Sequence, residues 1–131
     1  MAYLTSQVAK RSDLRAAFPW ARSVLCVGLQ YDTARPYSTA AAASRGWISR
    51  YAWGDDYHDV MKAMLDRVVE RLRSEAGPLE ARAYVDTGPI AEKAWAAAAG
   101  LGAWGKNACL LHPEHGSWFF LGEIVTDLDL P

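Results

Sequence analysis

Hydrophobic positions along the chain follow two different spacings, which together predict alternating strands and helices. The run 23–31 is almost continuously apolar and carries β-branched residues, which predicts a strand covered on both faces. Over 55–76 the apolar positions recur at helical spacing, which predicts a long helix with one apolar face and core-filling methionines. The residues of that predicted face are Val60, Met61, Met64, Leu65, Val68, Val69 and Leu72. Asp55 and Asp56 can cap the start of this helix, and the Gly-Pro pair at 77–78 ends it.

Turn-forming and capping residues set the other elements of the first half. A short helix is predicted over 12–18, with Ser12 or Asp13 as its cap and Pro19 as its end. A loop of about twenty residues, 32–53, separates the first strand from the long helix. Loops of this length are uncommon and often bind ligands.

The second half of the chain repeats the alternation in shorter segments. A strand over 80–86 leads into a helix that begins with Pro89 at its first position and stops at Gly100. The elements predicted after it are a short strand at 109–111, a turn at 112–116, and a strand over 117–126 with an interruption at Gly122. The order β, α, β, α, β, β predicts a layered sheet of the α/β or α+β class, folded as one domain over residues 1–131.

Composition and charge exclude several classes of protein. The chain is 51% hydrophobic and has a net charge of −1, so neither disorder nor a global basic field for nucleic acid is expected. No apolar run approaches the roughly 18 residues of a membrane span, and no signal peptide pattern opens the chain. The two cysteines, Cys26 and Cys109, stand in apolar runs and are expected to be free thiols of a cytoplasmic protein. Because no Cys-x-x-Cys occurs, we do not expect this chain by itself to hold an iron–sulfur cluster or a four-cysteine zinc site.

Three arginines stand in or beside the long loop, among aromatic residues: Arg35, Arg45 and Arg50. This local patch is open to two interpretations. The arginines are either phosphate contacts for a nucleic acid, or solvated loop charges near surface aromatics.

Asp86 is the best single candidate for chemistry, because it stands at the end of an apolar strand-like run. An acid that donates a proton near neutral pH needs a raised pKa, which partial burial supplies. The alternative is that Asp86 is an N-terminal partner of the helix that begins near Pro89, where its pKa would be lowered. The two interpretations make opposite physical demands, and local sequence leaves both open.

A glycine-rich segment, 100–107, nearly matches the pattern of a phosphate-binding P-loop. It departs from that pattern because Asn107 stands where Ser or Thr should bind magnesium, and because the glycines follow a helix instead of a strand. The segment could still present amide N–H groups and the Lys106 ammonium to a polar or anionic ligand. Alternatively, it is a helix C-cap followed by a turn.

The three histidines do not predict a metal site. His112 and His115 flank a Pro-Glu pair with no third ligand nearby, as in an ordinary turn. His58 lies near the start of the long predicted helix, where it could anchor the preceding loop or line a pocket.

Four linked motifs, in order and spacing, resemble those of the epoxyqueuosine reductase family. They span residues 48–58, 85–89, 99–107 and 116–124 and so cover nearly the whole chain. The resemblance implies reduction of epoxyqueuosine to queuosine in tRNA, with cobalamin and two [4Fe–4S] clusters. It also implies an α+β fold, a layered sheet with flanking helices, similar to the nitroreductase-like cobalamin-binding core of reductive dehalogenases.

The resemblance also implies roles for particular residues. Asp86, in the Val-Asp-Thr-Gly motif, corresponds to the proton donor of the family. The residues implied to line the cofactor pocket are Arg50, Tyr51, Trp104, Gly105, Lys106, Asn107 and Ser117. The residues implied to contact substrate are His58, Thr87 and Gly88.

Partners follow from the same resemblance. The expected nucleic acid partner is the anticodon loop of a tRNA, with no membrane partner. The family's cluster-bearing ferredoxin-like segment is expected to lie outside these 131 residues, so that electrons come from that segment or from an electron-donor protein and this chain alone does not turn over. Two rival hypotheses are a non-catalytic corrin- or tRNA-binding module and a flavin-type reductase on a related scaffold.

Overall fold

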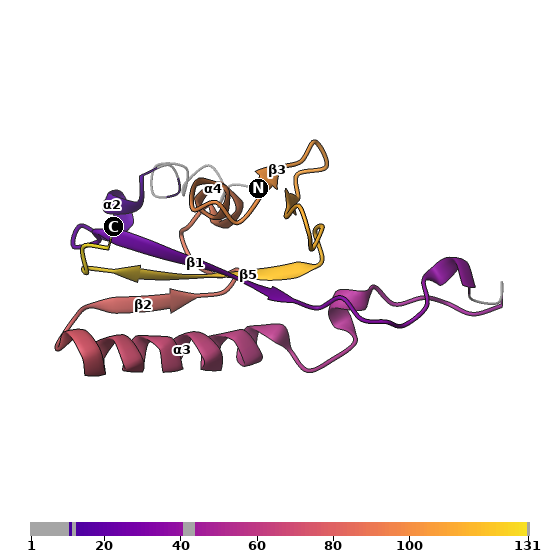
Figure 1. Ribbon diagram of the computed structural model, residues 1–131, viewed down its shortest axis with the longest axis horizontal. Helices are drawn as coiled ribbons and strands as arrows, with labels where there is room; N and C mark the ends of the chain where they lie inside the picture. The colour runs from indigo at the N-terminus through magenta and orange to yellow at the C-terminus, as the bar shows by residue number, and fades with distance from the viewer. Residues whose placement is uncertain (1–10, 12, 41–43, 131) are drawn as a thin grey trace.

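The computed structural model describes residues 11, 13–40 and 44–130 and has the α+β class that the sequence predicts. Three antiparallel strands form the main sheet in the order β1-β5-β2 (Figure 1). Their bounds are β1 Ser23–Gln30, β5 Phe119–Thr126 and β2 Ala81–Tyr84. The last strand of the chain is therefore inserted between the first two, which makes β5 the buried centre of the sheet.

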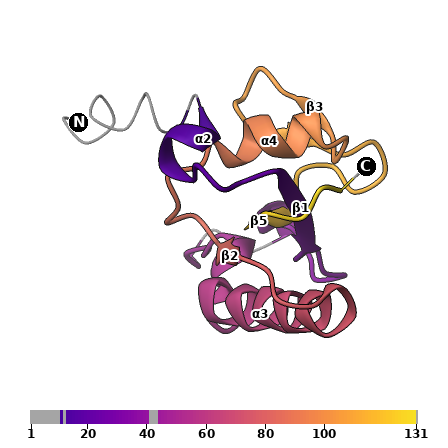
Figure 2. The ribbon, with the colours of Figure 1, turned by 90° about the vertical axis from the view of Figure 1, so that its left-hand side faces the viewer.

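Helices cover both faces of this sheet (Figures 1 and 2). The long helix α3, Tyr57–Ala76, lies on one face, and the short helices α2, Leu14–Ala17, and α4, Glu92–Ala98, lie on the other. Two hydrophobic cores result. The core under α3 contains Met61, Leu65, Val69, Val85 and Ile124, and the core under α2 and α4 contains Leu14, Phe18, Ala21, Ile90 and Val125.

The predicted strand 23–31 is confirmed as β1, although it is only partly buried because it lies at an edge of the sheet. Both of its faces are covered, since Val24 packs against one core and Leu25 against the other. The predicted interruption at Gly122 is wrong, because β5 pairs continuously from Phe119 to Thr126. A Cβ on Gly122 would lie 2.9 Å from Met61 Cε, so this glycine allows close helix–sheet packing instead.

The long helix is confirmed, but its predicted apolar face is too broad. Asp56 caps α3 by accepting a hydrogen bond from the His58 N–H. Of the seven apolar residues predicted to face the core, Met61, Leu65 and Val69 are buried, whereas Val60, Met64 and Val68 are 39%, 41% and 42% exposed. A small sheet contacts only a narrow stripe of one helix, made by residues at i and i+4. The prediction that Met64 fills the core is therefore wrong.

Two shorter helices differ from their predicted bounds. The helix predicted over 12–18 is confirmed in a shorter form, capped by the Asp13 side chain, while Ser12 lies outside the described residues. The helix predicted to begin at Pro89 begins at Glu92, because residues 87–90 form bends after β2. The prediction of Pro89 as the first helical residue is therefore wrong.

A small hairpin follows α4. It pairs β3, Ala103–Trp104, which sequence reasoning missed, with β4, Leu110–Leu111, which lies in the predicted strand at 109–111. The predicted turn at 112–116 is confirmed by paired backbone hydrogen bonds between His112 and Gly116 of 2.8 and 3.0 Å.

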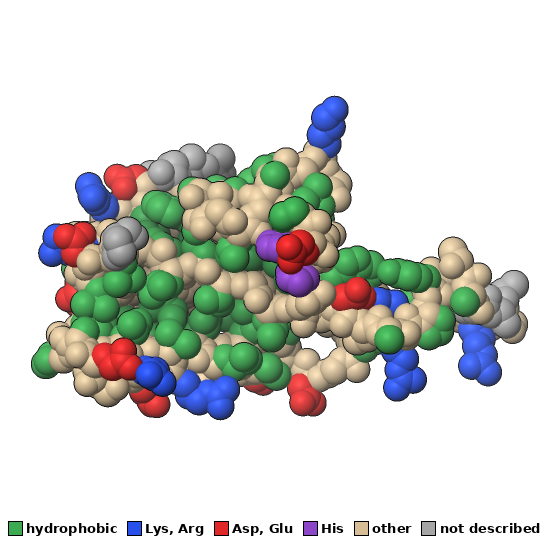
Figure 3. All heavy atoms as spheres, in the orientation of Figure 1, with side chains coloured by type: hydrophobic (Ala, Val, Ile, Leu, Met, Phe, Trp, Pro, Cys, Tyr) green, Lys and Arg blue, Asp and Glu red, His purple; other side chains and the backbone are tan. Residues whose placement is uncertain are grey.

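The segment between β1 and α3 extends away from the layered body as an arm (Figure 1). Its described part includes two 3-10 turns, Ser38–Ala40 and Arg50–Ala52. Basic side chains, which in this segment are all arginines, project from this arm, while hydrophobic side chains cover much of the body on the same face (Figure 3). In the part of the chain that the structure describes, no helix is both long and apolar enough to cross a membrane.

Candidate active site

Asp86 lies in a tight turn directly after β2. Its φ angle is +57°, in the left-handed region that few residues other than glycine adopt, and the Thr87 N–H donates to the Val85 carbonyl at 2.6 Å. Such strain persists only where the surrounding structure imposes it, and it often marks a functional site. The turn places the Asp86 carboxylate at the edge of the sheet with its side chain 45% exposed.

The first turn of α3 supplies two partners for this carboxylate. The Tyr57 hydroxyl donates a hydrogen bond to Asp86 Oδ2, and His58 Nε2 lies 3.3 Å from the same oxygen. His58 Nδ1 lies 2.7 Å from Asp56 Oδ1, so the helix-capping residue also orients the imidazole. Burial, with a further contribution from the bond to Asp86, raises the pKa of Tyr57, and this phenol therefore stays a neutral donor. The hydrogen bond to Asp56 raises the pKa of His58.

Two further acids lie on the other side of Asp86. Glu92 is in the first turn of α4, and Glu123 is a fully buried residue of β5. Burial, followed by the charge of Asp86, raises the pKa of Glu92 to about 7. Burial, followed by the charges of Glu92 and Asp86, raises the pKa of Glu123 to about 8. Asp86 thus lies between two hydrogen-bond donors and two acids that can carry protons near neutral pH.

The alternative role for Asp86, as partner of the following helix, is not what the structure shows. Helix α4 begins six positions later, with Ala91 at its N-cap. The side chain of Asp86 instead meets Tyr57 and His58. The carboxylate is therefore held by tertiary contacts that the local sequence does not reveal.

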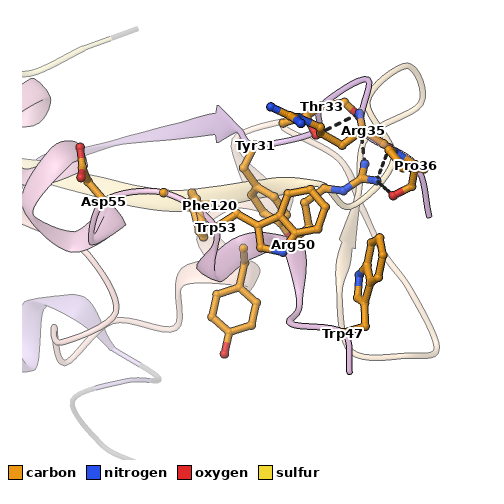
Figure 4. Close-up of a pocket in the computed structure, with 11 residues that line it drawn as sticks. Tyr31, Thr33, Arg35, Pro36, Trp47, Arg50, Trp53, Asp55 and Phe120 are labelled. Carbon is orange, nitrogen blue, oxygen red and sulfur yellow. Dashed lines mark hydrogen bonds between the residues drawn. The ribbon is translucent and has the colours of Figure 1, made fainter. Parts of the chain in front are cut away.

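An aromatic pocket of about 710 Å³ opens near these residues (Figure 4). Its lining residues are Tyr31, Thr33, Arg35, Pro36, Trp47, Arg50, Tyr51, Trp53, Gly54, Asp55 and Phe120. Phe120 connects it to the acid, because its ring stacks on that of Tyr57 at 4.0 Å with 2° between the planes. The flat aromatic walls suit a planar ligand.

Arg50 shapes this pocket from within. Its side chain is buried, and its guanidinium donates to Asp32 Oδ1 at 2.5 Å. It also donates to the Arg35 carbonyl at 2.9 Å (Figure 4). It also lies over the rings of Tyr37 and Trp118, at 4.8 and 4.9 Å from their centroids.

Both interpretations of the arginine patch are therefore wrong for Arg50. It is not a solvated charge, and its donors are occupied by the loop instead of being free for a phosphate. Arg35 and Arg45 are exposed.

The glycine-rich segment is a helix end followed by a hairpin, as one of its two interpretations predicts. Gly100 has a φ of +82° at the end of α4, and Asn107 Oδ1 accepts from the Cys109 N–H at 3.1 Å. Lys106 is exposed, and Lys93 Nζ fastens the hairpin to α4 by donating to the Ala108 carbonyl at 2.7 Å.

The structure brings together only part of the predicted site. His58 contacts the Asp86 carboxylate, and Thr87 and Gly88 follow Asp86 in the chain. Arg50 and Tyr51 line the neighbouring pocket. The remaining predicted residues do not line that pocket: Trp104, Gly105, Lys106, Asn107 and Ser117.

Three residues of the site were missed by sequence reasoning: Tyr57, Glu92 and Glu123. The signal for Glu123 was present, because a carboxylate inside the apolar run Phe-Phe-Leu-Gly-Glu-Ile-Val is costly to bury without a purpose. Tyr57 and Glu92 carry no comparable signal, since each stands in the first turn of a helix where polar residues are ordinary.

The histidines and cysteines in the described part of the chain form neither a cluster of three or more potential metal ligands nor a disulfide. No group of three or more His, Cys, Asp or Glu side chains in this part of the chain could hold a metal ion. His112 and His115 stack on each other with ring centroids 4.6 Å apart. Cys26 and Cys109 are free thiols, as predicted, and burial raises the pKa of Cys26 to about 12.

Taken together, the fold and site define an α+β domain that holds an acid beside an aromatic pocket. A family model described as "Epoxyqueuosine reductase QueG, DUF1730" matches residues 11–87, and the chain belongs to that family. The epoxyqueuosine reductase of Synechocystis sp. is 50% identical over 121 residues, which cover 92% of this chain and 41% of that relative. The chain thus spans about two fifths of the length of this curated relative.

Solved structures give the same result. A crystal structure of epoxyqueuosine reductase with an epoxyqueuosine-modified tRNA-Tyr stem loop is 32% identical, with a TM-score of 0.83, and the match covers 95% of this chain and 33% of that chain. The epoxyqueuosine reductase of Bacillus subtilis, solved with its aspartate-containing catalytic loop swung out of the active site, is 29% identical with a TM-score of 0.81. That match covers 95% of this chain and 33% of that chain.

Proposed function

We propose that this chain is the catalytic core of an epoxyqueuosine reductase, and that Asp86 is the acid that protonates the oxygen removed from the epoxide. The observation that carries the proposal is the position of Asp86, held in a strained turn by Tyr57 and His58 beside an aromatic pocket. A catalytic carboxyl must be oriented and yet reachable by substrate, and a half-exposed carboxylate held by two side chains meets both needs. The aspartate-containing catalytic loop of the Bacillus subtilis relative supports the same role.

Cobalamin is the cofactor proposed for this core. The aromatic pocket fits one flat side of a corrin, because its walls are largely apolar and it is open to one side. Arg50 and Tyr51 would contribute to that wall, with Trp104, Gly105, Lys106, Asn107 and Ser117 proposed to meet the periphery of the ring from the hairpin and the start of β5. When bound, cobalamin would supply the electrons that break the carbon–oxygen bond. The electrons would reach it from [4Fe–4S] clusters outside these residues or from an electron-donor protein.

The protein's own residues would handle orientation and protons. The Tyr57 O–H fixes the direction of the Asp86 carboxyl, and Thr87 and Gly88, next in the same turn, are proposed to contact the substrate base. His58 can donate to the same carboxylate after a proton has left it. Expulsion of the epoxide oxygen builds negative charge on that oxygen, which a positioned acid neutralises.

The proposed substrate is a tRNA whose modified base is turned out into the site. A relative that binds an epoxyqueuosine-modified tRNA stem loop supports this choice. The exposed Arg35, Arg45 and Lys106 are candidates for phosphate contacts. If they make such contacts, affinity should fall steeply with salt concentration.

A cobalamin titration into the purified 131-residue chain, followed by absorbance, tests the core of this proposal. Saturable binding, with a spectrum that shifts toward the form without the lower nitrogen ligand, is expected. Absence of binding would contradict the assignment of a cofactor site to this chain. In an enzyme that also carries the clusters, Asp86→Asn should lower turnover by about 10²–10⁴-fold while leaving cobalamin affinity unchanged.

A second candidate is a module that binds corrin or tRNA without redox chemistry. The observation that favours it is the presence of only two cysteines, with no Cys-x-x-Cys spacing. This candidate predicts cobalamin or stem-loop binding that Asp86→Asn leaves intact, together with no turnover when a cluster-bearing donor protein is added.

A further inference from the structure

Behind Asp86 lie two acids, the fully buried Glu123 and the partly buried Glu92. Both carboxylate oxygens of Glu123, and Oε1 of Glu92, are buried and have no hydrogen-bond partner among the residues that the structure describes. A buried charged carboxylate without a partner is very unfavourable, so such groups are normally kept as neutral acids. A neutral acid carries a transferable proton, which is the property that the reaction needs.

The sheet register brings these acids behind the catalytic turn. Glu123 pairs with Tyr84, two residues before Asp86, and it points to the α4 side of the sheet, opposite to its neighbour Ile124. Glu92 starts α4 on that same side. Glu123 and the first turn of α4 therefore lie on one side of the sheet, next to the end of β2 from which the Asp86 turn follows. The charges of Glu92 and Asp86 add to the effect of burial in raising the pKa of Glu123.

The proposed reaction consumes more protons than one acid can hold. Removing an epoxide oxygen to leave a carbon–carbon double bond adds two electrons and two protons and releases one water. A low-potential donor, the reduced corrin proposed above, would supply the electrons. The first proton converts the opened epoxide oxygen into a hydroxyl, and the second allows that hydroxyl to leave as water. A substrate base bound over the half-exposed Asp86 would limit the access of solvent to it, and a second proton stored within the protein would then be needed.

We propose that Asp86, Glu92 and Glu123 form a carboxyl relay, in which Glu92 returns a proton to Asp86 between the two protonation steps and Glu123 holds a reserve proton behind it. This inference rests on the function proposed above. Asp86 gives its proton to the first oxygen species, takes one from Glu92, and gives that second proton to the departing hydroxyl. Glu123 can then reprotonate Glu92. After the product leaves, solvent restores the lost protons through the exposed Asp86.

Other charged groups around the relay are compatible with this direction of transfer. The groups that face it are Tyr57, His58 and Asp56 from α3, Arg11 near Glu92, and Cys26 of β1 opposite Glu123. The pKa of Cys26, about 12, keeps that thiol neutral, so it does not compete for the relay's protons. The pKa values of about 7 for Glu92 and about 8 for Glu123 keep both acids protonated in a slightly acidic to neutral range.

Carbon-13 NMR of the carboxyl groups in this chain, titrated from about pH 4 to pH 10, tests the relay without any cofactor. Two glutamate signals are expected with midpoints near 7 and 8, well above those of the other glutamates. Glu92→Gln should lower the Glu123 midpoint by about 1, and Asp86→Asn should lower both midpoints, because each removes a nearby negative charge. Glu70→Gln is the matched control, since Glu70 is an exposed glutamate of α3, and it should move neither midpoint.

Four outcomes would overturn part or all of this picture. Glutamates that all titrate near their ordinary value of about 4.3 would overturn the relay, as would an unchanged Glu123 midpoint in Glu92→Gln. Glu92 is less buried than Glu123, so its variant keeps the test valid if Glu123→Gln fails to fold. If the chain binds cobalamin but its carboxyl groups titrate independently, the relay alone is overturned. If the carboxyl groups are coupled but the chain never binds cobalamin, the proposed function is overturned, and the role of the relay in it as well.

In the cluster-bearing enzyme, Glu92→Gln should slow single-turnover reduction by about tenfold or more and remove the fall in rate between about pH 7 and 8, with cobalamin affinity unchanged. A purely structural role for Glu92 would leave the shape of the pH profile as in the parent enzyme. That result would also overturn the relay.

Discussion

The α3 face and the α4 face of the sheet differ in what the central strand β5 buries on each. On the α3 face, Ile124 packs with Met61 and Leu65 in a hydrophobic core. The residues on either side of Ile124 in the same strand, Glu123 and Val125, are buried on the α4 face. That face therefore holds a buried carboxyl group beside an apolar side chain. One face thus contributes stability through packing, while the other gives up stability to hold an acid near Asp86.

This difference has an energetic consequence. A buried acid destabilises the fold as soon as it ionises, and an apolar residue of similar size would avoid that cost. The α3 face has no such group, although its first turn reaches Asp86 through Tyr57 and His58. Substitutions on the two faces should therefore differ in their dependence on pH, and the four predictions below test that difference.

The largest effect on stability is expected from Met61→Ala on the α3 face. Met61 is fully buried, so its truncation should lower the free energy of unfolding by about 4 kcal/mol through lost packing and a new cavity. Urea unfolding at several pH values should give the same loss at each, because no titratable group is involved. Met64→Ala, an exposed methionine one turn away, is the control and should change stability by less than about 0.5 kcal/mol.

Next in size is the pH-dependent cost of Glu123. Its pKa is raised from 4.5 in the unfolded chain to about 8 in the folded one, so the folded state holds the extra proton. Stability from this group is complete below about pH 4.5 and is lost as the pH rises toward 8, by on the order of 3 kcal/mol. Glu92 adds to the loss in the same direction, up to about pH 7.

Glu123→Gln should therefore flatten the dependence of unfolding free energy on pH and make the chain more stable than the parent near pH 8. The buried amide keeps a cost of its own, but that cost does not change with pH. A Glu123→Gln chain with the same slope as the parent between pH 5 and 8 would show that Glu123 is not the group responsible.

The sequence was sufficient to predict the elements whose periodicity is strong. The continuous apolar run gave β1, and the 3.6-residue spacing gave α3 together with its cap at Asp56. The predictions that failed relied on local sequence signals whose effect is outweighed by tertiary contacts. Pro89 is a good first helical residue, yet the turn that holds Asp86 delays α4 until Glu92. Gly122 usually marks an interruption, yet here it makes room for Met61.

The candidate site was predictable only at Asp86, the residue proposed to carry the chemistry. Asp86 could be chosen because a carboxylate ends an apolar strand, and the family motifs supported that choice. The contacts of Arg50 could not be predicted, because they depend on how the arm folds back over it. The roles of Tyr57, Glu92 and Glu123 depend on three segments meeting at one turn, which no local pattern encodes.

A moderate effect is expected at the point where β5 meets α3. Gly122→Ala adds a Cβ that would lie 2.9 Å from Met61 Cε and 3.0 Å from Leu65 Cδ1, so the helix must shift. We expect a loss of about 2 kcal/mol in unfolding free energy, independent of pH. Gly46→Ala is a suitable control, because a Cβ there meets nothing within 4 Å. If Gly122→Ala were neutral, the α3 core would have to be looser than its contacts indicate.

The smallest effect tests the contact that joins the two faces. Tyr57→Phe keeps the ring stacked on Phe120 and removes only the hydroxyl that donates to Asp86, so stability should fall by about 1 kcal/mol. Tyr51→Phe, which removes the hydroxyl of an exposed pocket residue, should change stability by less than about 0.5 kcal/mol. In carbon-13 spectra of the carboxyl groups at a fixed pH, Tyr57→Phe should move the Asp86 resonance more than those of Glu92 and Glu123, since the phenol donates a hydrogen bond to Asp86 alone among the three acids. An unchanged Asp86 signal would mean that the hydroxyl does not hold the carboxylate in solution, and the orientation of the acid would then depend on His58 and on the strained turn.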